Sequence, residues 1–159
     1  MLTVRFITVG TLKEAYLKEA VAEYQKRLSG FCKVEEVNLK ESRLSDRPSE
    51  AEIKAALEAE GKAILDSIPS RAYAIALCVE GQQFSSPDLA KKLEKICDTA
   101  SDICFVIGSS YGLAPEVKKA CQLRLSVSEL TFPHQLMRVI LYETVYRCFN
   151  ILKGTQYHK

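Results

Sequence analysis

Apolar and polar positions alternate at the start of the chain and then recur at helical spacing. Residues 2–9 are rich in β-branched side chains and predict a first strand. In residues 12–28 the apolar positions follow a helical period, with Thr11 placed to cap the helix and Gly30 placed to end it. A short second strand is expected over residues 34–39.

Helical patterns and apolar runs of strand length continue to alternate through the rest of the chain. Ser49, with Glu52 three residues later, has the pattern of a capping box and predicts a helix that runs to about Asp66. The remaining expected elements are strands over 72–79, 103–107 and 123–127 and helices over 86–97, 115–120 and 133–152. Five strands and five helices in alternation predict one α/β domain over residues 1–159, with helices on both faces of a largely parallel sheet.

Composition and charge narrow the classes of function. The formal charge is only +2, so the net charge gives no indication of a strongly basic, nucleic-acid-binding surface, although it does not exclude a local basic patch. The six cysteines form no CxxC pair and are typical of reduced core thiols in a cytoplasmic protein. Neither histidine has a partner at ligand spacing, so we expect no metal site. We also expect no signal peptide and no membrane span, because no apolar run approaches ~18 residues.

Three segments that follow predicted strands are candidates for ligand binding, because parallel sheets bind ligands at the carboxyl ends of their strands. They are residues 77–81, 107–112 and 126–132. Gly108 and Gly112 would allow either a close backbone approach to a ligand or simply a tight turn. The glycines do not form the GxGxxG fingerprint of dinucleotide binding. The chain also has no GxxxxGK[ST] pattern, so a nucleoside triphosphatase is not expected.

The last predicted helix, residues 133–152, carries apolar residues all round its axis and should therefore be buried on most sides. His134 and Arg138 lie one turn apart on one face of this helix, and Glu143 and Arg147 lie one turn apart on nearly the opposite face. Charges on a buried helix need either partners or a function. The alternatives to catalytic roles are that His134 caps or packs the start of the helix, and that Glu143 and Arg147 form a structural ion pair or an interface bridge.

An ordered set of motifs in the second half of the chain is specific enough to indicate a family. The motifs are Val106-Ile107-Gly108…Gly112-Leu113, Leu125 to His134, Arg138-Val139…Glu143…Tyr146-Arg147 and Tyr157-His158-Lys159. Together with residues 9–13 near the start, they closely resemble the RlmH family of the SPOUT superfamily, and the resemblance runs the length of the chain. Members of that family methylate N3 of a pseudouridine in large-subunit ribosomal RNA.

The resemblance implies a parallel-sheet SPOUT methyltransferase fold whose carboxy-terminal part forms a trefoil knot around an S-adenosylmethionine pocket. It also implies a homodimer, which fits the all-round apolar terminal helix. This chain has Cys78 where the family usually has an acidic residue, and Ser109 where it usually has a second glycine. The residues that match the family's cofactor loops are Leu77, Gly108, Val127, Ser128, Glu129, Leu130, Thr131 and Phe132.

Methylation of pseudouridine N3 requires a group that takes the N3 proton or stabilises the resulting anion. His158, His134 and Glu143 are the residue types available as bases. Arg138 could offset negative charge on the base, and Tyr157 could stack on it. Without the resemblance, residues 157–159 would be interpreted as a frayed tail. The candidate catalytic residues are therefore His158, Tyr157, Glu143, His134 and Arg138.

We therefore predict a cytoplasmic, S-adenosylmethionine-dependent methyltransferase that acts on pseudouridine N3 in large-subunit ribosomal RNA. A chain without a separate RNA-binding domain suggests that the substrate is a structured particle, the ribosome. Two alternatives stay open. One is a noncatalytic ribosome-binding or assembly factor that keeps the fold, and the other is a related methyltransferase that acts on transfer RNA.

Overall fold

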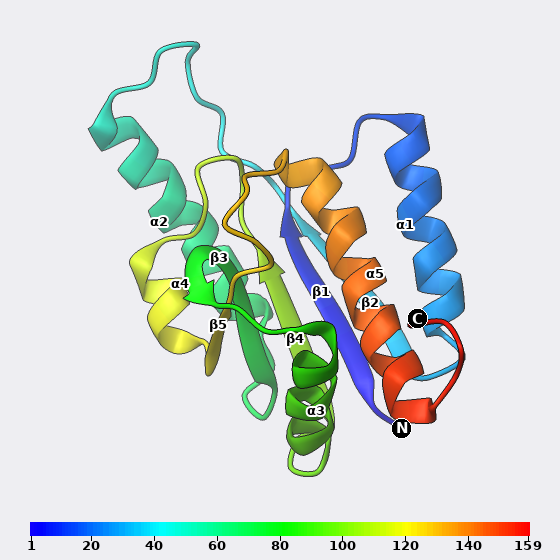
Figure 1. Ribbon diagram of the computed structural model, residues 1–159. Coiled ribbons are helices and arrows are strands. Elements are labelled where there is room, and N and C mark those ends of the chain that lie inside the picture. The colour runs from blue at the N-terminus through cyan, green and yellow to red at the C-terminus, as the bar shows by residue number, and fades with distance from the viewer.

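The protein is one parallel five-stranded sheet covered by helices, in a computed structural model that describes residues 1–159 (Figure 1). The strand order is β2-β1-β4-β3-β5, and every paired strand runs parallel to its neighbour. The predicted alternation of five strands and five helices is confirmed. The elements are β1 Thr3–Val9, α1 Ala15–Leu28, β2 Lys33–Leu39, α2 Glu50–Ser67, β3 Tyr73–Gln82, α3 Ser86–Cys97, β4 Asp102–Ile107, α4 Pro115–Ala120, β5 Leu123–Leu125 and α5 His134–Lys153.

Helices cover both faces of the sheet, as the apolar strands predict. Along β1, Val4 and Phe6 belong to a core of buried residues shared with α1, α3 and α5. The alternate residues Ile7 and Val9 belong to a second core shared with α2 and α4. In Figure 1, α5 lies between α1 and α3 on the first of these faces. The terminal helix is therefore flanked on both sides, and only Leu136 and Lys153 within it are exposed.

The limits of the first helix differ from those predicted. Thr11 does not cap α1, which has Glu14 at its N-cap position without a side-chain hydrogen bond. The preceding segment is instead tethered to α5, because the backbone N–H of Lys13 donates to Gln135 Oε1 at 3.3 Å. Gly30 directly follows the C-cap residue Ser29 and so lies at the predicted terminating position, but its φ is not positive and the helix end is not left-handed. By contrast, the predicted capping box at the start of α2 is confirmed.

The chain leaves the sheet earlier than predicted at its last strand. β5 ends at Leu125, and residues 126–133 then cross to the start of α5 (Figure 1). Pro133 occupies the N-cap position of α5 with extended ψ, which is consistent with a helix whose start is marked by proline. The threading of this segment into a trefoil knot stays a prediction.

A buried guanidinium connects the terminal helix α5 with the end of the first strand, β1. Arg138, on α5, is 1% exposed, and its Nη2 donates to the carbonyl oxygens of Val9 at 2.7 Å and Gly10 at 2.6 Å. Its Nε and Nη1 atoms are buried without a hydrogen-bond partner. Burial lowers the pKa of Arg138 from its ordinary value, but an arginine at this position remains charged near neutral pH. The contact fixes the second turn of α5 against the carboxyl end of β1.

Replacing this cation should destabilise the fold. Arg138→Met keeps an unbranched apolar stem but removes the guanidinium and leaves the Val9 and Gly10 carbonyls without their donor, so we expect a loss of about 2–4 kcal/mol in the free energy of unfolding. Urea denaturation measures the loss. Arg71→Met, at an exposed turn, is the control and should change stability by less than about 0.5 kcal/mol. Equal stability of the two variants would contradict the assigned role.

Candidate active site

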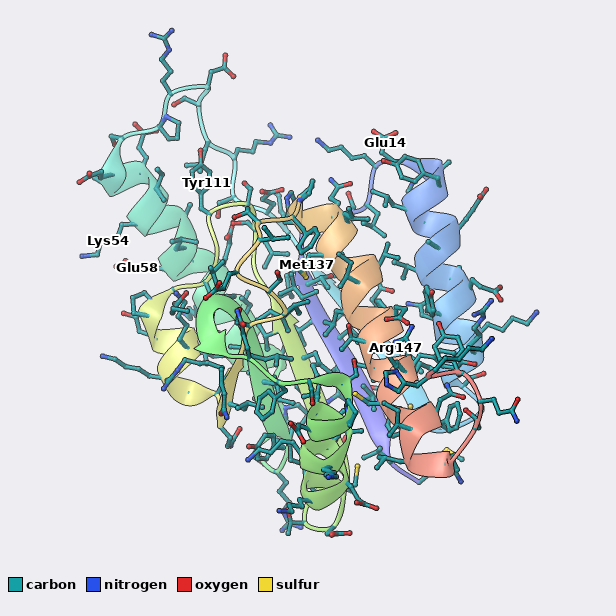
Figure 2. All side chains as sticks on the ribbon, viewed as in Figure 1. Glu14, Lys54, Glu58, Tyr111, Met137 and Arg147 are labelled. Carbon is teal, nitrogen blue, oxygen red and sulfur yellow. The ribbon has the colours of Figure 1, made fainter.

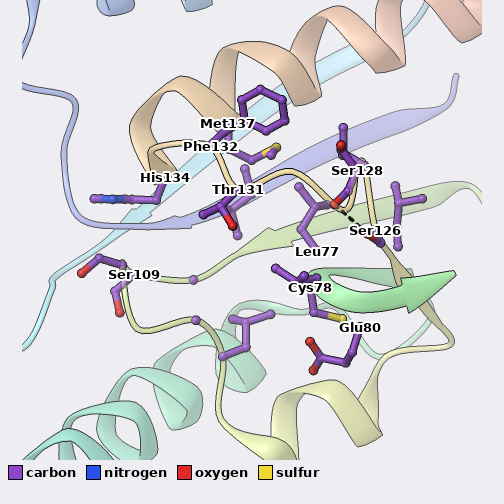
Figure 3. A pocket seen from close by; sticks show the side chains of 18 of the residues that line it. Leu77, Cys78, Glu80, Ser109, Ser126, Ser128, Thr131, Phe132, His134 and Met137 are labelled. Atoms are coloured by element: carbon purple, nitrogen blue, oxygen red, sulfur yellow. Dashed lines mark hydrogen bonds between the residues drawn. The ribbon is translucent and has the colours of Figure 1, made fainter. Parts of the chain in front are cut away.

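A cavity of about 370 Å³ lies at the carboxyl ends of three strands (Figure 3). It is bounded by the carboxy-terminal half of β3, by the ends of β4 and β5 with the segments that follow them, and by the first turn of α5. Small-molecule sites typically have volumes of ~300–1,000 Å³. The three strand-end segments that the sequence nominated for ligand binding therefore meet around one pocket of suitable size.

Most of the predicted cofactor residues line this pocket. Glu129 is the exception, because it is exposed and lies outside the lining. Sequence reasoning missed Met137 and Lys118, which also line the cavity. Met137 lies three residues after His134, so helical spacing could have indicated it. The predicted site residues that line the cavity are Leu77, Gly108, Val127, Ser128, Leu130, Thr131, Phe132 and His134.

The loop after β4 explains why position 108 is glycine. A Cβ atom at Gly108 would lie 2.1 Å from the carbonyl oxygen of Gly112, so any other residue would force the loop open. The loop is closed by a hydrogen bond from the N–H of Gly112 to the carbonyl of Ser109 at 2.9 Å, and Gly112 has a φ of +88°. Tight folding of the loop on itself is therefore sufficient to require Gly108. Ser109 is 6% exposed and fits where the family has glycine.

A bulge in β3 shapes the opposite wall of the pocket. Leu77 and Gln82 both pair with Leu125, so the residues between them arch out of the regular ladder. The backbone returns at Gly81, where a Cβ would lie 2.7 Å from the carbonyl carbon of Leu125. Cys78 and the two residues after it line the cavity as a result. The bulge has no counterpart in the apolar pattern of the sequence, which predicts a simple strand.

Hydroxyl groups hold the segment after β5 in shape. Ser126, 3% exposed, donates from its Oγ to the carbonyl of Ser128 at 3.3 Å (Figure 3). Ser128 Oγ accepts from the N–H of Leu130 at 3.0 Å. Leu130 is 72% exposed at the rim of the pocket. The two serines therefore determine the path of the loop as well as lining the cavity.

His134 occupies the first turn of α5 and lines the pocket (Figure 3). The helix start has no side-chain cap hydrogen bond, so the structure does not support the capping alternative. Burial lowers the pKa of His134, and the nearby cations Arg138 and Lys13 act in the same direction while Glu41 opposes them. A neutral imidazole at the pocket can accept a proton or a hydrogen bond.

The predicted tail residues are ordered against the far half of α5. Tyr157 donates from its hydroxyl to Glu143 Oε1 at 3.2 Å, and its ring lies edge-on to Tyr146 with centroids 4.8 Å apart. Glu143 Oε1 also accepts from Arg147 Nε at 2.9 Å, which confirms the predicted ion pair. Arg147 Nη1 lies 3.2 Å from His158 Nδ1. Burial is the largest cause that raises the pKa of Tyr157 to about 12, so its hydroxyl stays protonated.

The structure thus divides the predicted catalytic residues into separate groups. His134 belongs to the pocket, but no residue after Met137 lines the cavity. Arg147 lies ten positions beyond Met137 on the same helix (Figure 2), which is roughly 15 Å along its axis. Arg138 is buried between α5 and β1 and does not line the cavity, so its predicted part in catalysis stays a prediction.

Two further observations concern the whole chain. None of its helices combines the length and the apolar character that crossing a membrane requires. No group of three or more His, Cys, Asp or Glu side chains is arranged to hold a metal ion.

Comparisons with known proteins agree with the fold. A family described as "Predicted SPOUT methyltransferase" matches residues 2–158. A ribosomal RNA large subunit methyltransferase H from Streptococcus thermophilus is 52% identical over 157 residues, which is 98% of this chain and 99% of the relative. The protein of the same name from Leuconostoc mesenteroides is 46% identical over 159 residues, covering 99% and 100% of the two chains.

The fold also resembles a solved structure of a probable methylase family protein from Haemophilus influenzae. The TM-score is 0.54 at 14% identity, over 98% of this chain and 70% of that one. At this identity the likeness supports the fold alone. The full-length matches in sequence decide the family: the chain belongs to the SPOUT methyltransferases and, among them, to the ribosomal RNA large subunit methyltransferase H (RlmH) family.

Proposed function

We propose that this protein transfers a methyl group from S-adenosylmethionine to N3 of a pseudouridine in large-subunit ribosomal RNA, within the ribosome. One observation carries the proposal: three strand-end segments and the start of α5 enclose a single pocket, in a chain whose relatives are named ribosomal RNA large subunit methyltransferase H. The enzyme class comes from the family, while the pocket supplies a place for the cofactor. The proposal goes beyond the enzyme class in naming pseudouridine as the methylated base and the ribosome as the substrate.

The chemistry of the lining fits the cofactor. Leu77, Val127 and Phe132 offer apolar surface for the adenine ring, and Ser128 and Thr131 offer hydroxyls for polar edges. The cavity is about 370 Å³, and the tight loop at Gly108 leaves no side chain to fill it from that side. When bound, the cofactor supplies a methyl group on a positively charged sulfur, already activated for transfer.

The protein's own residues must orient the base and manage one proton. N3 carries a proton that has to leave as its electron pair takes up the methyl group. His134 is at the pocket and is kept neutral by burial, so it is the candidate acceptor within the same protomer. Glu143 is less available, because its Oε1 already accepts from Arg147 and Tyr157.

We propose a homodimer in which the tail of one protomer reaches the pocket of the other. Within a single chain the tail and the pocket lie apart, although the proposed chemistry needs both. Leu130, at the pocket rim, is 72% exposed, and Leu136, on the outward side of α5, is 38% exposed. Two large apolar side chains next to the pocket suit contact with a second copy.

Cofactor binding should protect one cysteine and leave a similar one unchanged. Cys78 lines the pocket and Cys97 ends α3 outside it; both are half-buried, and burial raises the pKa of both thiols. Saturating S-adenosylhomocysteine should slow alkylation of Cys78 by roughly tenfold or more, because the occupied pocket excludes the reagent. Peptide mass spectrometry measures both rates, with Cys97 as the internal control. Unprotected Cys78 would argue against this cofactor site.

The interface should be sensitive to a charge on the outward side of α5. Leu136→Asp should give a folded monomer at micromolar concentration, because a carboxylate at a buried interface is strongly unfavourable. Ala55→Asp introduces the same charge at an exposed position of α2, on the opposite face of the sheet, and should leave the dimer intact. Light scattering measures the mass of each variant, and circular dichroism checks the fold. A monomeric wild type would refute the proposed dimer.

Methyl transfer to ribosomes that lack the modification tests the function itself. The wild type should label these ribosomes in a single turnover, and removal of residues 157–159 should slow the reaction by ~10²-fold or more without loss of cofactor affinity. Transfer RNA serves as the competing substrate. Cofactor binding without labelling of either substrate would indicate a noncatalytic ribosome-binding factor. Labelling of transfer RNA alone would indicate a methyltransferase that acts on transfer RNA.

A further inference from the structure

We infer that Arg147 fixes His158 in the tautomer with its proton on Nε2, so that His158 donates a hydrogen bond to the target base and does not act as the general base. The inference rests on the proposed function and deepens it. From the sequence, His158 could act either as a base or as a hydrogen-bond donor, and the inference assigns the second role. It starts from a single contact, the 3.2 Å approach of Arg147 Nη1 to His158 Nδ1.

The contact has only one chemically sensible direction. A guanidinium has five N–H donors, no acceptor, and does not lose its proton in proteins. Nδ1 of His158 must therefore be the acceptor and carry a lone pair. A neutral imidazole with an unprotonated Nδ1 carries its proton on Nε2. The second ring nitrogen of His158 is then a donor.

The orientation of the guanidinium is itself fixed. Nε and Nη2 of Arg147 both donate to Glu143 Oε1, at 2.9 and 2.5 Å. Cζ of Arg147 lies over the ring of Tyr157, 4.9 Å from its centroid. Tyr157 donates to the same carboxylate oxygen at 3.2 Å. Because Nε and Nη2 are already bonded to Glu143, Nη1 is the nitrogen of Arg147 that contacts His158. These contacts attach Tyr157 and His158 to Glu143 and Arg147 on α5.

This arrangement opposes the use of His158 as a base. Its Nε2 already carries the proton, and protonation of Nδ1 would set an N–H against the N–H of Arg147 and place two cations side by side. A donor at Nε2 has a different use. Loss of the N3 proton leaves negative charge on the carbonyl oxygens that flank N3, and a fixed hydrogen-bond donor stabilises charge that develops in the transition state.

The N3 proton then needs a separate acceptor. In the proposed dimer, His158 of one protomer would meet a base held at the pocket of the other, where His134 lies. His134 is neutral and can accept the proton as the electron pair of the N3–H bond forms the new bond to the methyl carbon, while the bond from that carbon to sulfur breaks and leaves its electron pair on sulfur. The two histidines of the sequence thus take different parts, one as donor and one as acceptor.

The tautomer can be observed directly in the full-length dimer. The chain has only two histidines, so ¹⁵N-histidine labelling and long-range ¹H–¹⁵N correlation give two ring systems, assigned with His134→Gln. We expect His158 in the Nε2–H form alone at neutral pH. In Arg147→Met, a detectable Nδ1–H fraction should appear because the fixed donor is gone. An Nδ1–H form in the wild type, or no change in Arg147→Met, would overturn the role of Arg147.

Two substitutions at His158 separate a donor from a base. Glutamine places an N–H₂ near the position of Nε2 but cannot take up a proton, whereas alanine can do neither. In single-turnover methylation of ribosomes, His158→Ala should slow the reaction by ~10²-fold or more, and His158→Gln should recover most of that loss, to within roughly tenfold of the wild type. If His158→Gln is as slow as His158→Ala, the donor assignment is wrong. If the wild type itself does not methylate ribosomes, the proposed function fails instead.

Discussion

The hydrogen bonds from Arg138 to the end of β1 are the contact on which the geometry of the site depends. β1 lies inside the sheet, between β2 and β4, so its carboxyl end is a fixed reference point. Arg138 attaches α5 to that point through two backbone carbonyls, and His134 lies one helical turn before it. A buried cation without such acceptors would be strongly unfavourable. The first turn of α5 and the loop leading into it are therefore held against the pocket by an interaction between the two ends of the chain.

The same helix explains why the tail and the pocket of one chain lie apart. Its first turn contributes His134 and Met137 to the pocket, and its far half holds the tail through Glu143 and Arg147. A helix is too stiff to bring its two halves together, so the tail and the pocket of one chain stay apart. A second copy removes this restriction if its tail lies over the first copy's pocket. The exposed Leu130 and Leu136 place apolar surface where such a copy would bind.

Much of the fold was predictable from the sequence, because its signals are local. Apolar runs, the Ser49 capping box and the proline before α5 indicated all ten elements and the parallel sheet. Long-range contacts were not predictable: helical spacing paired His134 with Arg138 but could not show that Arg138 is buried against β1. Periodicity also missed the bulge of β3, and the order of the tail depends on a partner 14 residues away, Glu143. The position of three segments at strand ends indicated where a ligand binds, whereas the identity of the cofactor came from the family resemblance.

The central claim is that each site combines the pocket of one protomer with the tail of its partner, and subunit mixing tests it most directly. Gly108→Val disrupts the pocket, because its Cβ would clash with Gly112 and force the loop open, and a chain cut before Tyr157 lacks the tail. Each variant alone should be inactive in methylation of ribosomes. Random mixing should restore about a quarter of the wild-type rate, because half of the dimers are mixed and each has one complete site. No recovery in verified mixed dimers would contradict the account.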